Sequence, residues 1–367
     1  MGGKIYQCNH CSKRRYMYLS CGSSLCPICQ GIKREQWQDR LNTMMLKVPY
    51  THITFTMPHQ LNGLAKRNPR IIYNILMRSA WTTINQLAAE KDNLGALPGM
   101  IAVLHTWGSD LKYHVHVHTL VTFGGLSEEN KWKWPARKHK LAPFRKVCST
   151  FRTIFLKLLE TQFKQKSVKH HSNYKELYAE LIKKRWVVHH TRPSADTSTI
   201  QQYLSRYVCR IAITDSRLTY SQGKSQVTIL YNDYQSQIPG QPAPKLTKIL
   251  HPLIAIDQFL CHVPPKNFQR VRYYGIHANS LKNKIQSQIT DKVKQNCQTL
   301  RTLFQIINQM IKSNPMQCDT CKKSSFTIIV LAANRYWIPQ NIRNYPQPIS
   351  KNRAPPPKPM PFLVTYP

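Results

Sequence analysis

The sequence predicts a protein of mixed α and β structure that begins with a small cysteine-rich domain. Three observations support this fold class. Five cysteines lie within the first 30 residues, apolar residues recur at helical spacing through 70–90, and residues 101–107 and 114–122 have the pattern of two strands joined by a turn. The chain has 367 residues, 41% of them hydrophobic, which is enough for two or three domains and an ample core.

The first cysteines have the spacing of a structural zinc site. Two CxxC pairs, separated by fourteen residues, consist of Cys8, Cys11, Cys26 and Cys29. Two thiolates in one tight turn can bind the same ion, and two such turns complete a tetrahedral Zn²⁺ site. Cys21 and His10 are alternatives for one of the four ligands, and buried reduced thiols are the alternative to a metal site. The polar neighbours favour zinc, so we expect residues 1–48 to form a zinc-binding domain.

Strand and helix patterns alternate after residue 48. The segment THITFTM, 51–57, directs Ile53, Phe55 and Met57 to one face and ends at Pro58. Helical patterns follow at 70–90, 143–165 and 173–186. The turn GSDLKY lies at 108–113, and a strand is expected at 186–190.

The later part of the chain continues this alternation and then becomes proline-rich. We expect a helix at about 197–213, a strand over SQVTILYNDY, and helices at 255–263 and 296–313. The last 30 residues hold nine of the 24 prolines, so residues 336–367 are expected to form an extended tail.

A further CxxC pair, Cys318 and Cys321, lies in a region that we expect to be helical, 286–335. Alone, this pair is half of a zinc site, which Cys297 or His277 could complete.

The segment YHVHVHTLV carries three histidines at strict alternation. Because side chains alternate across a strand, His114, His116 and His118 share one face and the intervening, mostly apolar residues share the other. Three stacked imidazoles are an unfavourable arrangement unless something binds them, and neutral imidazole is a common ligand of divalent metals. The alternative is a strand with solvated histidines on an exposed face.

The predicted helix at about 197–213 supplies a second set of functional candidates. Tyr203 and Tyr207 are four residues apart and share one helical face, and Arg206 and Arg210 share a neighbouring face that could bind phosphates. Ordinary amphipathic packing would explain two such tyrosines on their own. Together with a metal site, however, a tyrosine can attack a phosphodiester and form a covalent phosphotyrosine.

The charge of the chain indicates a polyanionic partner. Lys and Arg number 53 against 16 Asp and Glu, a formal net charge of +37, and nucleic acid neutralises such a charge through its phosphates. An anionic membrane surface is the alternative, but no long basic amphipathic stripe is visible. Trp132 and Trp134, among lysines, could stack on unpaired bases, or could be a structural aromatic pair at a loop edge.

Two absences further narrow the expected class. The start of the sequence has no apolar signal segment, and no run of eighteen apolar residues occurs, so we expect a cytoplasmic protein without membrane contact. The tripeptide GKS at 223–225 is not a Walker A motif, because Leu218 occupies the position of the required glycine.

The sequence resembles the HUH-type rolling-circle transposases of bacterial insertion sequences that carry paired tyrosines. The resemblance covers about residues 1–280 and is carried by blocks in the family's order. These blocks are CPICQ, THITFTMPHQL, LHTWGSDLKYHVHVHTLVTFGGLS, RWVVHHTRP, QYLSRYVCRIAI, VTILYNDY and FLCHVPPKNFQRVRYYGIHAN. The resemblance implies an α+β fold in which a central antiparallel β-sheet carries the histidines, helices flank it and the tyrosine helix packs nearby.

The resemblance also implies roles for particular residues. It places the HUH nuclease domain at 49–285 and a zinc-binding DNA-recognition domain before it. The histidine-hydrophobe-histidine motif corresponds to His116 and His118, with His114 as a candidate third ligand of Mg²⁺ or Mn²⁺. Tyr203 and Tyr207 correspond to the nucleophiles.

One tyrosine of such an enzyme would cleave single-stranded DNA, become joined to the 5′ end and free a 3′-OH. The other would act on the target or the second element end. A host helicase or the replication machinery would unwind the DNA, and the protein would associate with the nucleoid.

The chain departs from the family pattern at two positions, Val115, where many relatives have proline, and Cys209, where histidine is common. Gln201 and Gln202 are alternatives to His114 as the third metal ligand. Two other functions remain open. One is a replication initiator or relaxase with the same chemistry, and the other is a zinc-containing nucleic-acid-binding protein without catalysis.

Overall fold

A computed structural model describes residues 3–18, 27–168, 174–196, 212–278 except 222, 235 and 239, and the short segments 301–302, 305–306 and 317–332. The chain divides into two compact units. The first combines Met1–Arg40 with Thr299–Pro361, and the second combines Leu41–Gln298 with Phe362–Pro367. The predicted tyrosine helix lies almost wholly outside the described residues, as does the proline-rich tail expected at 336–367.

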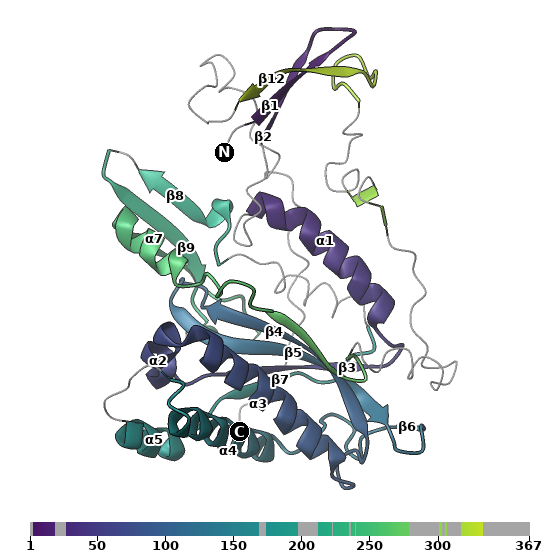
Figure 1. Cartoon of the computed structure of the whole chain (residues 1–367), viewed down its shortest axis with the longest axis vertical. Coiled ribbons are helices and arrows are strands. Elements are labelled where there is room, and N and C mark those ends of the chain that lie inside the picture. Colours follow the sequence, from purple (N-terminus) through teal and green to yellow (C-terminus); the bar gives the residue numbers. More distant parts are fainter. Residues whose placement is uncertain are drawn as a thin grey trace. The chain divides into compact units, whose positions relative to one another are not determined.

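The second unit is built on a six-stranded antiparallel sheet. Its strand order is β11-β4-β5-β3-β7, with β6 paired to the far end of β5 (Figure 1). The bounds of these strands are β3 Tyr50–Thr56, β4 Leu97–Trp107, β5 Tyr113–Leu126, β6 Trp132–Lys133, β7 Val188–His190 and β11 Val271–Gly275. This sheet confirms the α+β fold with a central antiparallel sheet, and the predicted strand at 51–57 and hairpin at 101–122 are both present.

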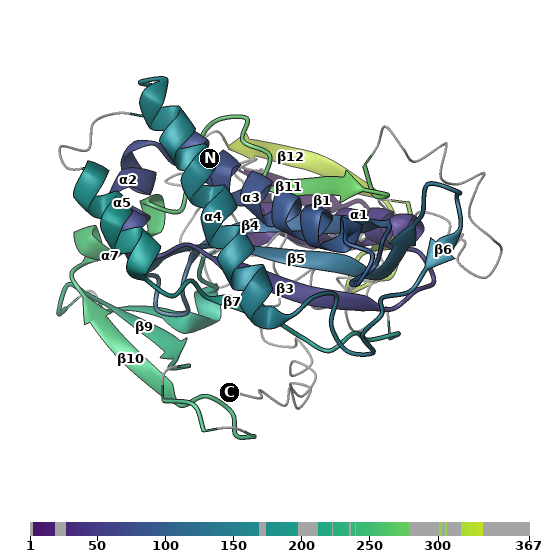
Figure 2. The same cartoon turned by 90° about the horizontal axis from the view of Figure 1, so that it is seen from below.

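Helices cover one face of this sheet (Figure 2). Their bounds are η1 His59–Leu61, α2 Asn62–Arg67, α3 Pro69–Ala89, α4 Phe144–Lys164 and α5 Tyr174–Lys183. Leu76 of α3 and Phe151 of α4 are fully buried against Phe55 of β3 and Val117 of β5. Apolar residues three or four apart on the helices pack against the apolar residues at every second position of the strands. The burial of these apolar surfaces holds the two layers together.

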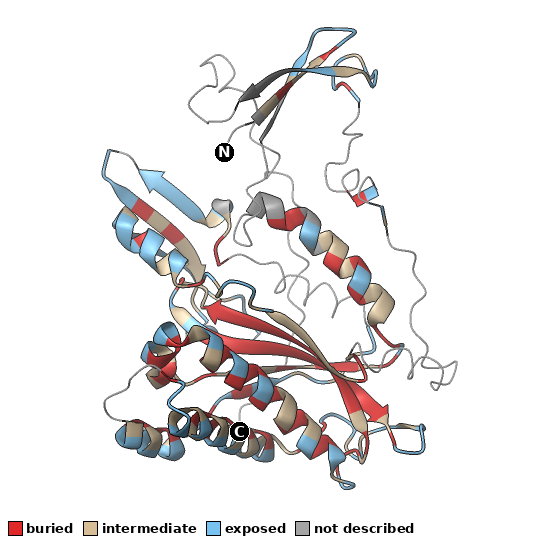
Figure 3. Cartoon of the chain, viewed as in Figure 1, coloured by how far each residue is buried: buried red, intermediate tan, exposed pale blue. Residues whose placement is uncertain are grey.

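The opposite face of the sheet is also covered, because the central strands β4 and β5 are buried almost throughout (Figure 3). This face carries His116 and His118 of β5, Ile101 and Val103 of β4, and Leu120. The alternative of solvated histidines on an open strand face is therefore wrong for His116 and His118, whereas His114 is exposed.

A smaller three-stranded antiparallel sheet, in the order β10-β9-β8, completes the second unit. The segments are η2 Asp215–Arg217, β8 Leu218–Ser221, β9 Gln226–Asn232, β10 Lys245–Leu250 and α7 Pro252–Leu260. Val227 and Ile229 of β9 form a core with Ala212, Trp107 and Leu111, which joins this sheet to the turn between β4 and β5.

The first unit joins segments that are distant in sequence. Its sheet has the order β12-β1-β2, with β1 Gly3–Cys8, β2 Arg14–Tyr18 and β12 Phe326–Ala332, and α1, Pro27–Met44, begins in this unit. Arg301 binds Asp39 of α1 at 2.6 Å.

The prediction for the region before the proline-rich tail requires correction. We expected a separate helical region at 286–335, but Thr299–Pro361 belongs to the same unit as the first 40 residues, and β12 is a strand. The reason is strand pairing, because β12 forms a ladder along the whole of β1, from Gly3 to Cys8. Among the helices of the described residues, none combines the length and hydropathy that crossing a membrane requires.

Candidate functional site

Three histidines converge on the face of the large sheet that lies opposite helices α3 and α4. Nitrogen atoms of His105, His116 and His118 all lie within 4.8 Å of one another. The Nε2 atoms of His116 and His118 are 3.0 Å apart, and the ring of His105 meets both rings edge-on at centroid distances of 5.5 and 4.8 Å. Three imidazole nitrogens in one place are a ligand set for a divalent metal.

The hairpin register brings these residues together. His116 and His118 are two apart on β5, so they share a face, and His105 of β4 lies directly opposite His116. The turn between the strands fixes this register, since the N–H of Gly108 donates to the carbonyl of Lys112 at 2.9 Å. Leu111 takes a left-handed conformation in the turn, with φ of 63°.

Burial keeps His116 in the neutral form that binds metal. His105, His116 and His118 are 2%, 9% and 7% exposed. Burial, together with the nearby His114, lowers the pKa of His116 to about 3. At neutral pH the His116 ring therefore carries a free lone pair, and no proton has to be displaced by a metal ion.

Hydrogen bonds at the far nitrogens orient two of the rings. Nδ1 of His116 lies 2.8 Å from the carbonyl oxygen of His114, to which it donates, and this leaves Nε2 unprotonated. Nδ1 of His118 lies 3.0 Å from Nε2 of His52 and 3.3 Å from the hydroxyl of Thr54, both on β3. A proton on Nδ1 of His118, donated to His52, again directs Nε2 toward the cluster.

The sequence identified two of the three clustered residues and missed the third. His114 is exposed and does not join the cluster, although its ring lies 5.1 Å from that of His116 and its carbonyl orients His116. The structure instead brings in His105, whose ring stacks on Trp107 at 4.5 Å. The available signal was a histidine in the mostly apolar strand IAVLHTW, but only the strand register shows that it faces His116.

The other predicted residues of this site lie outside the described residues. These are Tyr203, Tyr207, Arg206, Arg210, Gln201 and Gln202. The described chain ends before them at Asp196 and resumes after them at Ala212.

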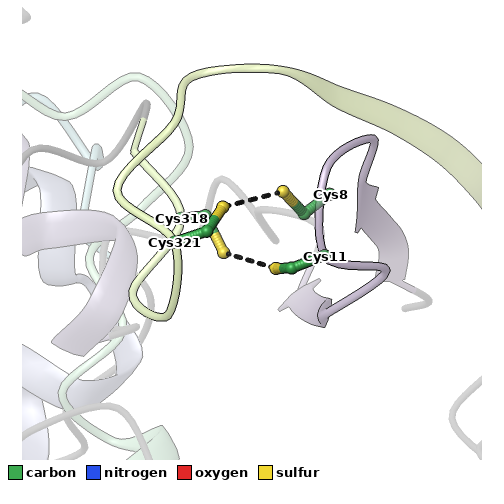
Figure 4. Close-up of side chains that lie close together, drawn as sticks. All are labelled: Cys8, Cys11, Cys318 and Cys321. Atoms are coloured by element: carbon green, nitrogen blue, oxygen red, sulfur yellow. Dashed lines mark hydrogen bonds between the residues drawn. The ribbon is translucent and has the colours of Figure 1, made fainter.

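A second cluster lies in the first unit, where four thiols converge (Figure 4). Sγ of Cys8 lies 3.5 Å from Sγ of Cys321, and Sγ of Cys11 lies 3.5 Å from Sγ of Cys318. All four are free cysteines. Backbone N–H groups of His10 and Cys11 lower the pKa of Cys8.

The pKa of Cys318 is also lowered, to about 6, by the N–H groups of Cys321 and Thr320. Thiolate, the form that binds Zn²⁺, is favoured at these two positions.

The partner of the first CxxC pair therefore differs from our prediction. We expected Cys8 and Cys11 to join Cys26 and Cys29, whereas the structure joins them to Cys318 and Cys321. The side chains of Cys21, Cys26 and Cys29 lie outside the described residues. Of the two residues expected to complete the later pair, Cys297 is not described.

The other, His277, is not in the thiol cluster. Its Nε2 lies 3.2 Å from the hydroxyl of Tyr50 in the second unit.

The antiparallel sheet, the histidine cluster on it and the charge of +37 are together typical of nucleic-acid-processing proteins with a histidine site that can hold a metal ion. Comparison with known families is more specific. Residues 99–284 match the family model described as "Putative transposase" (Y2_Tnp), and residues 1–57 match "Transposase zinc-binding domain". The first match includes all three clustered histidines.

Two curated relatives of the chain also carry the name transposase. The chain is 33% identical over 301 residues to "Putative transposase y4qJ" of Sinorhizobium fredii, covering 79% of this chain and 74% of the relative. It is 28% identical over 285 residues to "Transposase for insertion sequence element IS801" of Pseudomonas savastanoi pv. phaseolicola, covering 76% and 67%. No solved structure was found to match the chain.

The chain belongs to the paired-tyrosine transposase family of the IS91 and IS801 type, within the rolling-circle HUH group. It is a transposase that acts on DNA, with an N-terminal zinc-binding domain.

Proposed function

We propose that this transposase cleaves and rejoins single-stranded DNA through a phosphotyrosine, with Mg²⁺ or Mn²⁺ bound by His105, His116 and His118. The observation that carries the proposal is the convergence of three buried imidazoles on the central hairpin. When bound, a divalent ion there polarises the scissile phosphate and stabilises the charge that develops in the transition state.

The nucleophile in this proposal is Tyr203 or Tyr207. The phenolic oxygen loses its proton and attacks the phosphorus, the bond from phosphorus to the 3′ oxygen breaks, and that oxygen leaves as a 3′-OH. The products are a 5′-phosphotyrosine and a free 3′ end. In the reverse step, a DNA 3′-OH attacks the same phosphorus and releases the tyrosine, so the strand is resealed without ATP.

The described residues on either side of the tyrosine segment support its placement near the histidines. Ser194 pairs with Tyr50, which lies opposite Thr122 of β5. Ala212 shares a core with Trp107, which lies opposite Tyr113 at the other end of β5. From Tyr113 to Thr122 a strand extends about 30 Å.

The histidines lie between these two flanking positions. We therefore propose that the segment between these positions, which carries Tyr203 and Tyr207, lies near the histidines.

Single-stranded DNA is the proposed substrate, both at the element ends and at the target. The net charge of +37 provides attraction to phosphates, and Arg206 and Arg210 are placed by their spacing to contact the phosphates next to the tyrosines. Trp134, which is 56% exposed beside Trp132, offers a surface on which an unpaired base can stack.

Unwinding would come from a host helicase or from replication. The only sequence resembling a phosphate-binding loop is GKS at 223–225, and the structure places it in the exposed turn between β8 and β9, outside any strand-to-helix junction.

The test is incubation of the purified chain with a labelled single-stranded hairpin from an element end, with Mn²⁺ or Mg²⁺. We expect a protein–DNA adduct that survives denaturation and a product with a free 3′-OH. Variants Y203F and Y207F together should abolish the adduct, and H116A with H118A should abolish it while DNA binding persists. A replication initiator or relaxase would form the same adduct, and family membership favours transposition. DNA binding without any adduct would support a non-catalytic role instead.

A further inference from the structure

Two CxxC turns that are distant in sequence have the same backbone structure. In each turn, the N–H of the first cysteine donates to the carbonyl five residues later, at 2.8 Å for Cys8 and 2.9 Å for Cys318. In each, the N–H four residues later donates back to the carbonyl of that cysteine at 2.9 Å. The residue carrying this N–H, Ser12 or Lys322, is left-handed, with φ of 58° and 59°. The two turns therefore have matching backbone conformations.

The four sulfur atoms have the spacing of a tetrahedral metal site. Two Sγ–Sγ distances are 3.5 Å, and all four sulfurs lie within 4.8 Å of one another. A Zn–S distance of about 2.3 Å sets sulfurs roughly 3.8 Å apart in a tetrahedral site. A disulfide requires about 2.05 Å, so the observed distances match thiolates around an ion better than a covalent bond.

Contacts away from the sulfurs hold the two turns against each other. The side chain of Asn9, in the first turn, donates to the hydroxyl of Ser325 at 2.7 Å and accepts from the hydroxyl of Thr327 at 2.8 Å. Arg15 forms an ion pair at 2.8 Å with Asp319, which lies inside the second turn. The pairing of β1 with β12 continues this contact. The four cysteines therefore lie close together because the segments that carry them also contact each other through side chains and through the pairing of β1 with β12.

We propose that a zinc ion of the zinc-binding domain is held by Cys8, Cys11, Cys318 and Cys321, so that this domain is completed by residues far outside its matched region. The family model for the zinc-binding domain ends at residue 57, and half of the proposed ligands follow more than 250 residues later. Both turns lie in the same compact unit. The C-terminal CxxC is then a required part of the N-terminal domain.

The other ligand sets weighed for this ion are less consistent with the structure. His10 is exposed and, among the described residues, does not join the group. Cys26 and Cys29 remain available for a separate ion, which the proposal neither requires nor excludes.

The proposal predicts how the zinc content of the purified chain changes when cysteines are replaced. Zinc is measured by mass spectrometry of the metal in the full chain and in the paired variants C8S/C11S and C318S/C321S. Each pair should lose one equivalent of zinc, and the fourfold variant should lose no more than either pair, because all four residues bind one ion. The pair C148S/C261S, two free cysteines of the second unit, is the matched control and should keep the wild-type content.

Two results would overturn the proposal. One is wild-type zinc content in C318S/C321S alongside a loss in C8S/C11S. The other is a loss of one equivalent in C26S/C29S that does not add to the loss in C8S/C11S when the two pairs are combined, which would restore the ligand set expected from the sequence.

A measurement on the unaltered chain covers the case in which the variants do not fold. Thiol alkylation is followed by mass spectrometry before and after a chelator is added. The four clustered cysteines should be protected together and become reactive together, while Cys148 and Cys261 are unaffected by the chelator. Alkylation of Cys318 and Cys321 while Cys8 and Cys11 stay protected would contradict the proposal. Neither measurement involves DNA, so the result is independent of the nuclease chemistry.

Discussion

Replacing His52 with alanine tests whether the orientation of the metal ligands matters. Nδ1 of His118 lies 3.0 Å from Nε2 of His52, and H52A removes this acceptor without touching a proposed ligand. Burial and the nearby His189 lower the pKa of His52 to about 3, so its ring is neutral at pH 7 and Nε2 can accept. The loss leaves Nδ1 of His118 with the longer 3.3 Å contact to the hydroxyl of Thr54, so the ring is oriented less firmly.

The expected effect follows from the energy of that contact. Loss of an orienting partner behind a metal ligand typically weakens metal binding by about 10- to 100-fold. Since about 1.4 kcal/mol corresponds to a factor of ten, this loss is about 1.4–2.8 kcal/mol of binding free energy. We therefore expect the Kd for Mn²⁺ to rise about 10- to 100-fold in H52A and DNA cleavage to recover at high Mn²⁺ concentration.

The assay is calorimetric titration of Mn²⁺ into the metal-free chain, paired with cleavage measured across Mn²⁺ concentrations. H52N should restore part of the affinity, because its amide oxygen can accept from His118. H190A, which removes an exposed histidine of β7, is the matched control and should bind Mn²⁺ normally. Equal affinities of H52A and the wild type would refute the reasoning, as would a loss of cleavage that excess Mn²⁺ does not recover.

Three further predictions concern other residues of the second unit. H105A should abolish measurable Mn²⁺ binding and cleavage, whereas H114A should reduce both only a few-fold, because His114 orients His116 through its backbone carbonyl. Acidification should destabilise the metal-free chain. Burial lowers the pKa of His116 to about 3 and that of His277 to about 4, so their stabilising contribution is present above about pH 6.5 and is lost as the pH falls toward these values. Urea unfolding at pH 7, 6 and 5 should show a loss of up to about 1.4 kcal/mol per pH unit for each group. W134A should weaken binding of single-stranded DNA by about 1–3 kcal/mol, measured by fluorescence anisotropy.

Each of these predictions has a defined contrary result. Normal Mn²⁺ binding in H105A would remove this residue from the site, and equal losses in H105A and H114A would point to a general effect of the hairpin. Stability that is constant between pH 7 and pH 5 would show that these histidines do not titrate on unfolding. For W134A the matched control is Y234A, an equally exposed aromatic residue in another loop, which should leave DNA affinity unchanged.

The sequence predicted the parts of the site that depend on local periodicity. Alternation in YHVHVHTLV is enough to put His116 and His118 on one face, and helical spacing is enough to find α3 and α4 within a residue or two. His105 could not be found in this way. Its position depends on the register between β4 and β5, which is set by a turn and by an irregularity between His105 and Trp107.

The zinc ligands show a different limit of sequence reasoning. Three CxxC pairs can be combined in several ways, and proximity in the chain favoured Cys8/Cys11 with Cys26/Cys29. What joins Cys8 to Cys321 is the pairing of β1 with β12, a contact across more than 300 residues. The segment FTIIVLA is rich in β-branched residues, which indicates a strand, but it lies within the region 286–335 that we expected to be helical.

The central claim is that a tyrosine of 197–213 becomes covalently joined to DNA, and the most direct test is to identify that tyrosine. The wild-type adduct is formed with Mn²⁺ on single-stranded DNA, digested with nuclease and trypsin, and sequenced by mass spectrometry. Cleavage after Arg206 separates Tyr203 and Tyr207 into different peptides. We expect a 5′-linked nucleotide on one or both of these tyrosines and none in H105A. An adduct on any other residue, or one that forms equally without divalent metal, would contradict the account.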